Sequence, residues 1–311
     1  MKKITIVGSI NVDNILHIKD LPQPGETIAM SNFSKVAGGK GANQAVAGAR
    51  ADSKIIFIGR VGDDDNGTYM LNQFKEDGID TTYVAVTPNQ NTGQAYILLQ
   101  ESGQNSIIIQ HGANFDLTPA DVRKAENEIK TSDFVVAQFE TPLSATIEAF
   151  KIARQAGIPT ILNPAPARED IPQELLELTD LITPNETESE SITGIPVTDE
   201  ESMRKSAEYF HKLGVKGVII TLGKTGSYIS TNKLQEIVPA FTVKAVDTTA
   251  AGDTFIGALA SELNRDLSNL KESVIYASKS SSFTVQSLGA FPSIPKRSTV
   301  EKALKEDENN G

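Results

Sequence analysis

The chain has 311 residues, of which 39% are hydrophobic and 22% charged, enough to bury a sizeable core in one large domain with an appendage or in two smaller domains. Its formal net charge of −11 argues against a nucleic-acid partner, because binding a phosphate backbone needs a concentrated positive surface. The sequence contains no cysteine, which excludes disulfides, thiolate catalysis and cysteine-ligated zinc.

Short apolar runs rich in β-branched residues alternate with helical patterns along most of the chain. Strands are predicted at residues 3–7, 54–58, 133–137, 158–162, 181–182, 216–221 and 242–246. Helices are predicted at residues 42–51, 67–76, 119–129, 144–155, 199–212, 253–264 and 269–284. Strands that alternate with helices indicate an α/β fold with a largely parallel sheet covered by helices on both faces.

Two stretches, residues 14–36 and 81–110, interrupt this alternation. The first has no helical pattern and includes the turn sequence LPQPGET. The second has three strand-like runs, with a hairpin loop expected around Gly103. We expect the two stretches to form a small separate sheet over the strand ends, where open parallel sheets bind ligands. Surface decoration is the alternative interpretation.

Targeting signals and histidine metal motifs are not expected. The apolar run at the N-terminus is too short for a secretory signal, and no later stretch approaches the length of a membrane span. The three histidines lack HExxH spacing. The sequence therefore predicts a soluble, cytoplasmic protein with no membrane partner.

The sequence GGKGANQA at Gly38–Ala45 places three glycines before a helix. Glycine permits positive φ and close backbone approach, so Gly41 and Asn43 stand where a polyhydroxylated ligand can bond main chain and amide together. The alternative is a tight loop that only leads into the helix.

The sequence DTTAAGDTFIGAL at Asp247–Leu259 follows a predicted strand and opens a helix. Backbone N–H groups of residues 250–252 should therefore form an anion hole at the positive end of the helix dipole, suited to a transferring phosphoryl group. Asp253 beside this hole is placed to take a proton from a hydroxyl group. A helix cap is the alternative role for Asp253.

The sequence TPNETE at Thr183–Glu188 places Asn185 and Glu188 three residues apart. On a helix the two side chains share a face and can offer oxygen ligands to Mg²⁺, directly or through water. A helix-capping arrangement explains the same residues equally well.

Two glycine-containing turns lack the spacing of known nucleotide motifs. TLGKTGS at Thr221–Ser227 is not a Walker A motif, because Val218 stands where that motif requires glycine. The turn after Gly8 has no GxGxxG pattern, which argues against a dehydrogenase.

Polar residues also follow predicted strand ends: Asn11 and Asp13 after the first strand, and Glu140 after residues 134–139. They are placed like ligand contacts, and the Asp13 carboxylate can accept bonds from two adjacent sugar hydroxyls. Each of them taken alone is equally compatible with a turn former.

Taken together, these motifs resemble those of the ribokinase family of carbohydrate kinases, the phosphofructokinase B type. GGKGAN near residue 40 and DTTAAGD near residue 250 are similar to its two signatures, in the same order, and the likeness spans essentially the whole chain. The resemblance implies an ATP-dependent kinase acting on the primary hydroxyl of D-ribose. It also implies a Rossmann-like kinase domain (residues 1–13, 37–80 and 111–311) and a small β-sheet lid (14–36 and 81–110) that closes on the sugar and pairs with another lid in a homodimer.

The resemblance further implies roles for the residues at matching positions. The catalytic group would be Ala250, Ala251, Gly252 and, as general base, Asp253. The sugar would be bound by Asn11, Asp13, Gly39, Lys40, Gly41, Asn43, Glu140 and Asp253. ATP would contact Asn185, Thr221, Gly223, Gly226, Gly252 and Ser278. Glu188 would help to place Mg²⁺, and a K⁺ site would use Asp247, Thr249, Thr284, Ser287, Gly289 and Ser293.

Two positions depart from the family pattern. Ser278, or Lys279 if the alignment shifts by one, stands where these kinases often carry a histidine near the nucleotide base. Ser287 replaces a residue that is frequently basic, but a ligand that acts through its carbonyl group tolerates this change.

Other functions that the sequence leaves open are a family kinase for fructose, a deoxysugar or a nucleoside, a non-catalytic sugar sensor, and an NAD-dependent oxidoreductase. The presence of Asp253 beside an anion hole argues against the sensor, which needs neither. The missing GxGxxG argues against the oxidoreductase.

Overall fold

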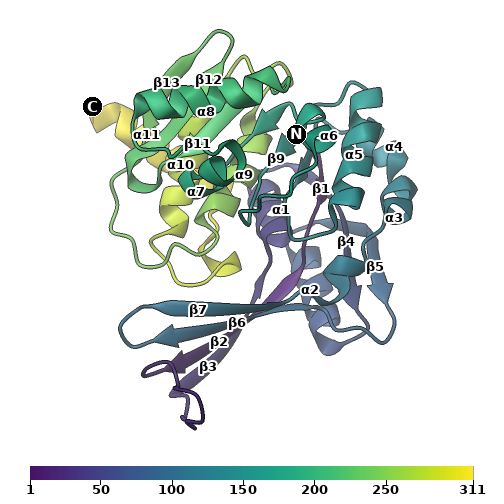
Figure 1. Cartoon of the computed structure of the whole chain (residues 1–311), viewed down its shortest axis with the longest axis vertical. Coiled ribbons are helices and arrows are strands. Elements are labelled where there is room, and N and C mark those ends of the chain that lie inside the picture. The colour runs from purple at the N-terminus through teal and green to yellow at the C-terminus, as the bar shows by residue number, and fades with distance from the viewer. Residues whose placement is uncertain (311) are drawn as a thin grey trace.

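A nine-stranded sheet runs through the computed structural model, which describes residues 1–310 (Figure 1). Its strands lie in the order β13 (Gln235–Pro239), β12 (Gly226–Thr231), β11 (Gly217–Thr221), β10 (Leu181–Ile182), β9 (Thr160–Leu162), β8 (Phe134–Ala137), β1 (Lys3–Val7), β4 (Lys54–Gly62) and β5 (Asp80–Thr87). All neighbouring pairs are parallel except β11–β12 and β12–β13, which are antiparallel. The predicted mostly parallel sheet is thus confirmed.

Side chains on the two faces of the sheet enter two separate hydrophobic cores. In β8, Phe134 and Val136 belong to one core and Val135 and Ala137 to the other. This alternation follows from the two-residue period of a strand, and burial on both faces explains why the strand is apolar throughout.

Helices cover both faces. One core receives side chains from α1 (Lys40–Arg50), α2 (Asp65–Glu76), α9 (Ala251–Glu262), α10 (Leu270–Thr284) and α11 (Arg297–Asn310). The other receives them from α3 (Pro119–Lys124), α4 (Glu126–Lys130), α5 (Leu143–Gln155), α6 (Gln173–Glu177), α7 (Glu186–Thr193) and α8 (Glu200–Lys212). The expected α/β layering is confirmed. No helix of residues 1–310 has both the length and the apolar character needed to cross a membrane.

A separate four-stranded sheet, which we call the lid, extends away from the large sheet (Figure 1). Its strands lie in the order β3 (Asn32–Gly38), β2 (Asn11–Ile18), β6 (Gly93–Gln100) and β7 (Asn105–Gln110). The tight connection between β6 and β7 contains Gly103 at φ 84°, as expected for the hairpin. Because Asn11 and Asp13 lie in β2, two of the predicted sugar contacts come from the base of the lid rather than from a loop.

Two strand predictions need correction. Residues 81–87, expected in the lid, belong to β5, which pairs with β4 at the edge of the large sheet. The pattern of an edge strand does not specify which sheet it joins, which is why the assignment of these residues to the lid was wrong. Residues 242–246, expected as a strand, form none, and Val246 there is 58% exposed. Instead, the hairpin of β12 and β13, which the sequence analysis did not identify, completes the sheet.

Candidate active site

Asp253 is held at the start of α9 by two side chains of α1. Asn43 donates a hydrogen bond from Nδ2 to one carboxylate oxygen (2.9 Å), and Gln44 donates from Nε2 to the other (3.1 Å). The alternative that Asp253 caps the helix is wrong, because the cap position is Ala250, in the left-handed region at φ 60°. A non-glycine residue in that region signals a strained backbone, of the kind that collects at functional sites.

Three carboxylates and one ammonium group share this buried space, which we call the charged cluster. Its members are Asp13, Lys40, Glu140 and Asp253. Burial, with repulsion from Glu140 and Asp253, raises the pKa of Asp13 to about 7. Burial also raises the pKa of Asp253, against the opposing effects of Lys40, Asn43 and Gln44. In this cluster, burial thus makes the carboxylates of both Asp13 and Asp253 stronger proton acceptors than exposed ones.

Lys40 is the only cation of the charged cluster. Burial by itself would lower the pKa of its ammonium group, but the carboxylates of Asp253, Glu140, Glu188 and Asp13 outweigh that effect and raise it. The ammonium group consequently stays charged and offsets part of the negative charge.

Glu140, which follows β8, anchors the start of α1. One of its carboxylate oxygens accepts hydrogen bonds from the Ser9 hydroxyl (2.5 Å) and from the Lys40 backbone N–H (3.1 Å). A carboxylate at a helix N-terminus is favoured by the helix dipole. Glu140 thereby links the turn after β1 to the helix that carries Asn43.

The glycines before α1 are explained by close backbone packing. Gly39 has φ 95°, and a Cβ atom there would lie 2.7 Å from the Asn11 nitrogen. A Cβ atom on Gly41 would lie 2.6 Å from the Ser9 nitrogen. Packing alone therefore accounts for both glycines, and their contact with a sugar stays a prediction.

Asn11 is oriented by Asn114, a residue that the sequence analysis missed. The Asn114 side chain accepts from the Ile10 N–H (2.9 Å) and donates to the Asn11 side-chain oxygen (2.7 Å). The amide group of Asn11 is therefore turned with its oxygen toward Asn114. No local pattern marks Asn114, because the short 3₁₀ helix at Gly112–Asp116 meets β2 only in the folded chain.

A cavity of about 580 Å³ lies between the β12–β13 side of the sheet, α9 and α10; we call it the hairpin cavity. Five of the six predicted ATP contacts line it: Thr221, Gly223, Gly226, Gly252 and Ser278. Its wall also includes Phe241, Thr242 and Val243, none of which was predicted as a site residue; Thr242 and Val243 were expected in a strand. The structure thus brings residues of TLGKTGS (Thr221–Ser227) and DTTAAGDTFIGAL (Asp247–Leu259) to one cavity.

Asn185, the sixth predicted ATP contact, does not line the hairpin cavity. It caps α7: its side chain accepts from the Glu188 N–H (2.7 Å), and the Glu188 carboxylate accepts from the Asn185 N–H (2.9 Å). The capping alternative is therefore confirmed. Its backbone bridges to Thr221 at the cavity edge. Among residues 1–310, no three His, Cys, Asp or Glu side chains form a cluster that could hold a metal.

The expected anion hole has its residues at the α9 N-terminus, but one donor is already engaged. The Ala251 N–H donates to the Thr248 carbonyl (3.2 Å), and the Ala251 carbonyl accepts from the Ser281 hydroxyl (2.8 Å). Gly252 faces the hairpin cavity. The α9 turn is thus tied to α10 beside the charged cluster.

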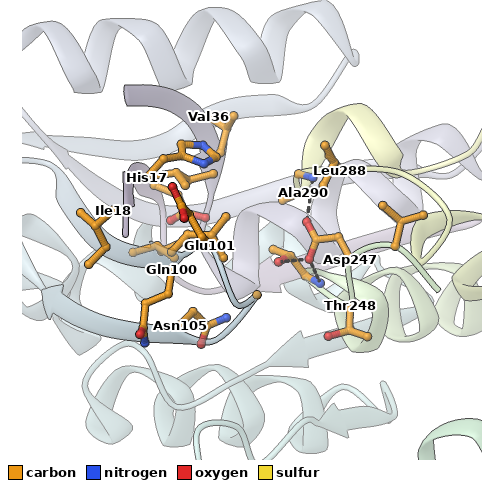
Figure 2. Close-up of a pocket in the computed structure, with 18 of the residues that line it drawn as sticks. His17, Ile18, Val36, Gln100, Glu101, Asn105, Asp247, Thr248, Leu288 and Ala290 are labelled. Atoms are coloured by element: carbon orange, nitrogen blue, oxygen red, sulfur yellow. Dashed lines mark hydrogen bonds between the residues drawn. The ribbon is translucent and has the colours of Figure 1, made fainter. Parts of the chain in front are cut away.

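A second cavity of about 570 Å³, the lid cavity, separates the lid from the loops around Asp247 and Leu288. Figure 2 shows His17 and Glu101 of the lid on one side and Asp247 and Leu288 on the other. Asp13 also lines this cavity. The charged cluster therefore opens toward the lid.

Three of the predicted K⁺ ligands meet at Asp247. Its carboxylate accepts from the Thr249 N–H (2.9 Å) and hydroxyl (2.7 Å) and from the Gly289 N–H (2.9 Å). Burial would raise the pKa of Asp247, but these hydrogen bonds outweigh it and lower the pKa. The side-chain hydroxyls of Thr284 and Ser293 form hydrogen bonds with the Thr254 hydroxyl and the Ala290 carbonyl, respectively.

Comparison with known proteins agrees with this architecture. Residues 1–297 match the pfkB family of carbohydrate kinases. Because the match covers almost the entire chain, this protein belongs to that family.

Individual relatives are similar over most of the chain. It is 49% identical over 309 residues to the bifunctional ribokinase/ribose-5-phosphate isomerase A of Fructilactobacillus sanfranciscensis, covering 99% of this chain but only 57% of that relative. It is 48% identical over 294 residues to the ribokinase of Staphylococcus aureus, covering 94% of this chain and 96% of that one. Among solved structures, it is similar to Arabidopsis thaliana ribokinase complexed with ribose and ATP, with a TM-score of 0.89 and 36% identity over 98% of this chain and 99% of that one.

Proposed function

We propose that this protein transfers the γ-phosphoryl group of ATP to the primary hydroxyl of D-ribose, forming D-ribose 5-phosphate. The observation that carries the proposal is the placement of Asp253. Its carboxylate is buried in the charged cluster, and the preceding residue, Gly252, lines the hairpin cavity. A proton acceptor is thus one residue away from a cavity suited to a nucleotide.

In the proposed reaction, Asp253 takes the proton of the sugar hydroxyl. The hydroxyl oxygen forms a bond to the γ-phosphorus while the bond to the oxygen bridging the β-phosphorus breaks, and ADP leaves. Because burial raises its pKa, the Asp253 carboxylate is a stronger base than an exposed aspartate, which suits it to accept this proton. The backbone at residues 250–252 and the α9 dipole would stabilise the charge on the transferring group.

Sugar binding is assigned to the end of the charged cluster that faces the lid. Carboxylates accept hydrogen bonds from hydroxyl groups, so Asp13 and Glu140 suit a polyhydroxylated ligand. The Asn43 side-chain oxygen is buried and has no hydrogen-bond partner among residues 1–310, which leaves it free for a sugar hydroxyl. Asn11, Gly39, Lys40 and Gly41 are the other proposed contacts. Ribose is chosen because both the Staphylococcus aureus relative and the Arabidopsis thaliana structure are ribokinases.

ATP is assigned to the hairpin cavity, with Asn185 contributing from its edge. Mg²⁺ would neutralise phosphate charge and would be held largely by ATP oxygens and water, with Glu188 nearby. The Glu188 carboxylate is already used by the α7 cap, so its contribution would pass through water. We propose that the protein works in the cytoplasm.

A K⁺ ion is proposed at the Asp247 loop. The Val246 and Asp247 N–H groups both donate to the Val285 carbonyl, which ties this loop to the segment after α10. Backbone carbonyls of Thr249, Thr284, Ser287, Gly289 and Ser293 would complete a site for a large monovalent cation.

A homodimer through the outer face of the lid is also proposed. Strand alternation places Leu16, Leu98, Tyr96 and Ile108 on the face opposite Asp13, and Ile108 is 59% exposed. A thin sheet with this apolar face is expected to be covered by a second copy. Sedimentation should show a dimer at micromolar concentration, and Ile108→Glu should dissociate it; a wild-type monomer would contradict the proposal.

The test of function is a panel of sugars assayed with ATP and Mg²⁺ for ADP release. Ribose should have the highest specificity constant, with fructose, 2-deoxyribose and adenosine much lower, and the product should carry phosphate on its primary carbon. A higher specificity constant for any of the other three would show that the sugar is assigned wrongly. ADP release with none of them would contradict a kinase for these substrates.

A further inference from the structure

Gln44 forms part of a chain of buried amide groups that ends on Asp253. Its side chain is fully buried. Its Nε2 donates to Asp253 Oδ1 (3.1 Å) and to Asn163 Oδ1 (3.1 Å), while its oxygen accepts from Gln138 Nε2 (2.6 Å). Every polar atom of Gln44 is therefore engaged inside the protein.

The direction of this chain follows from its far end. Asn163 donates from Nδ2 to the backbone carbonyl of Thr183 (3.1 Å), which can only accept. The Asn163 oxygen must then face Gln44, and Gln44 must turn its NH₂ group toward both Asn163 and Asp253. The backbone at Thr183 thus determines that Asp253 receives a donor from Gln44.

Gln138 supports the other side of the Gln44 amide. Its NH₂ group faces the Gln44 oxygen, and its own oxygen is buried with no partner among the described residues. A Cβ atom on Gly8 would lie 2.4 Å from that oxygen, so the side chain fills the space that Gly8 leaves. Tight packing and a buried unpaired oxygen together indicate that the Gln44 orientation is maintained at a cost to stability.

We propose that Gln44 is a positioning residue for phosphoryl transfer, which holds Oδ1 of Asp253 while Asn43 holds Oδ2. Donors on both oxygens fix the plane of the carboxylate and favour its ionised form against burial. Gln44 has no polar atom left for a ligand, so its effect reaches the substrate only through Asp253. This inference rests on the proposed role of Asp253 as the base.

The charged groups around Asp253 come from four other parts of the chain. Lys40 of α1 favours the ionised carboxylate, while Asp13 of β2, Glu140 after β8 and Glu188 of α7 oppose it. A substitution of Gln44 removes none of these charged groups. A change in the pH dependence of turnover is therefore attributable to the lost donor.

The first test is Gln44→Leu, which keeps the side-chain volume and removes the donor. We expect kcat to fall roughly 10- to 100-fold, with KM for ribose nearly unchanged and the acid limb of kcat moved to higher pH. Thr179→Val is the matched control, because it removes a buried hydrogen bond to the Leu175 carbonyl far from the site. The control should lower thermal stability and leave the pH profile unchanged.

The second test is Gln44→Glu, which should show the opposite pH signature. When the introduced carboxyl is ionised it repels Asp253, and when protonated it can donate to Asp253 Oδ1. The ratio of mutant to wild-type kcat should therefore rise as pH falls, whereas for Gln44→Leu it should fall. Ratios independent of pH, or a folded Gln44→Leu enzyme within twofold of wild-type kcat, would overturn the proposal.

A parallel assay of Asp253→Asn separates the two proposals. Loss of turnover in this variant together with normal turnover in Gln44→Leu would reject only the positioning role. Near-normal turnover in Asp253→Asn would reject the base itself.

Discussion

The charged cluster is built from ionisable side chains buried against one another, whereas the hairpin cavity is lined by glycines, small polar residues and apolar side chains such as Phe241 and Phe255. In the cluster, burial raises the pKa of both Asp13 and Asp253. In the cavity, Gly223 and Gly226 hold positive φ values of 53° and 124°, and Lys224 is the one charged side chain among the lining residues 221–285 that the structure describes. The first region relies on charge and the second on shape.

The two regions would achieve specificity in different ways. A cluster of carboxylates discriminates hydroxyl groups and moves protons, but it destabilises the empty protein because buried charge is costly. A cavity of glycines and backbone admits a large flat ligand at lower electrostatic cost. Changes to the cluster should therefore alter chemistry and pH dependence, and changes to the cavity should alter affinity and local packing.

The largest expected effect is that of Asp253→Asn on turnover. Removing a general base costs on the order of 10²–10⁴ in kcat, or roughly 3–5 kcal/mol. Binding of ribose and ATP, measured by calorimetry, should stay within about tenfold of wild type, because the substitution is nearly isosteric. If turnover were retained, the cluster would be a binding site without chemistry.

The second prediction concerns the stability cost of Asp13. Its pKa is about 7 in the folded protein and near 3.8 in an unfolded chain, so the folded state binds the proton more tightly. Stability from this group is present at low pH and lost as pH rises from about 4 to 7. Asp13→Asn should therefore raise the free energy of unfolding at pH 8 by about 2–4 kcal/mol and have little effect well below pH 4.

Chemical denaturation without ligands at several pH values measures this difference. Asp121→Asn is the control, because it should change the free energy of unfolding in the opposite direction. Burial would raise the Asp121 pKa, but hydrogen bonds from Thr118, Arg60 and Lys124 outweigh it and lower the pKa. That variant should be destabilised at pH 8. A pH-independent effect of Asp13→Asn would show that its charge carries no stability cost.

The third prediction tests shape in the hairpin cavity with two glycines. A Cβ atom at Gly226 would lie 2.1 Å from the Val238 carbonyl oxygen, whereas one at Gly223 meets nothing within 4 Å. Gly226→Ala should cost about 1–3 kcal/mol of stability and raise KM for ATP, and Gly223→Ala should cost only about 1 kcal/mol of backbone strain. Thermal denaturation and ATP titration measure both, and affinity for ribose should not change. Equal effects of the two variants would argue against a role for cavity shape.

The smallest expected effect is that of K⁺. An ion at the Asp247 loop would order the backbone before Ala250 without touching either substrate, so kcat should rise roughly two- to tenfold on replacing Na⁺ with K⁺ at equal ionic strength. Asp247→Ala should abolish the response, and Asp266→Ala, which changes an exposed loop carboxylate, should retain it. Equal turnover in the two salts would contradict the proposal that a K⁺ ion orders the α9 turn.

Local sequence was sufficient to predict most elements of the fold. The alternation of apolar strands and amphipathic helices predicted the layered α/β architecture, because burial on both faces requires continuous apolar strands. The glycines of the Gly38–Ala45 motif were also recognisable, since positive φ and close contact leave few residue choices. Asp253 and Asn43 stand in such motifs, and the structure brings them into hydrogen-bond contact.

Pairings between distant segments were decided only by the tertiary structure. An edge strand such as β5 has the same alternating pattern whichever sheet it joins. The polar residues of TPNETE are equally compatible with a helix cap and with metal ligands, and only the hydrogen bonds between Asn185 and Glu188 decide for the cap. Gln44 lies in the recognisable GGKGANQA motif, but its contacts could not be predicted there, nor could those of Gln138, Asn163 and Asn114, because an uncharged amide is informative only through its partners. Gln138 lies 94 residues from Gln44, Asn114 lies 103 residues from Asn11, and Gln44 lies 209 residues from Asp253. The sequence shows that these amide side chains are present, but only the folded structure determines their hydrogen-bond partners.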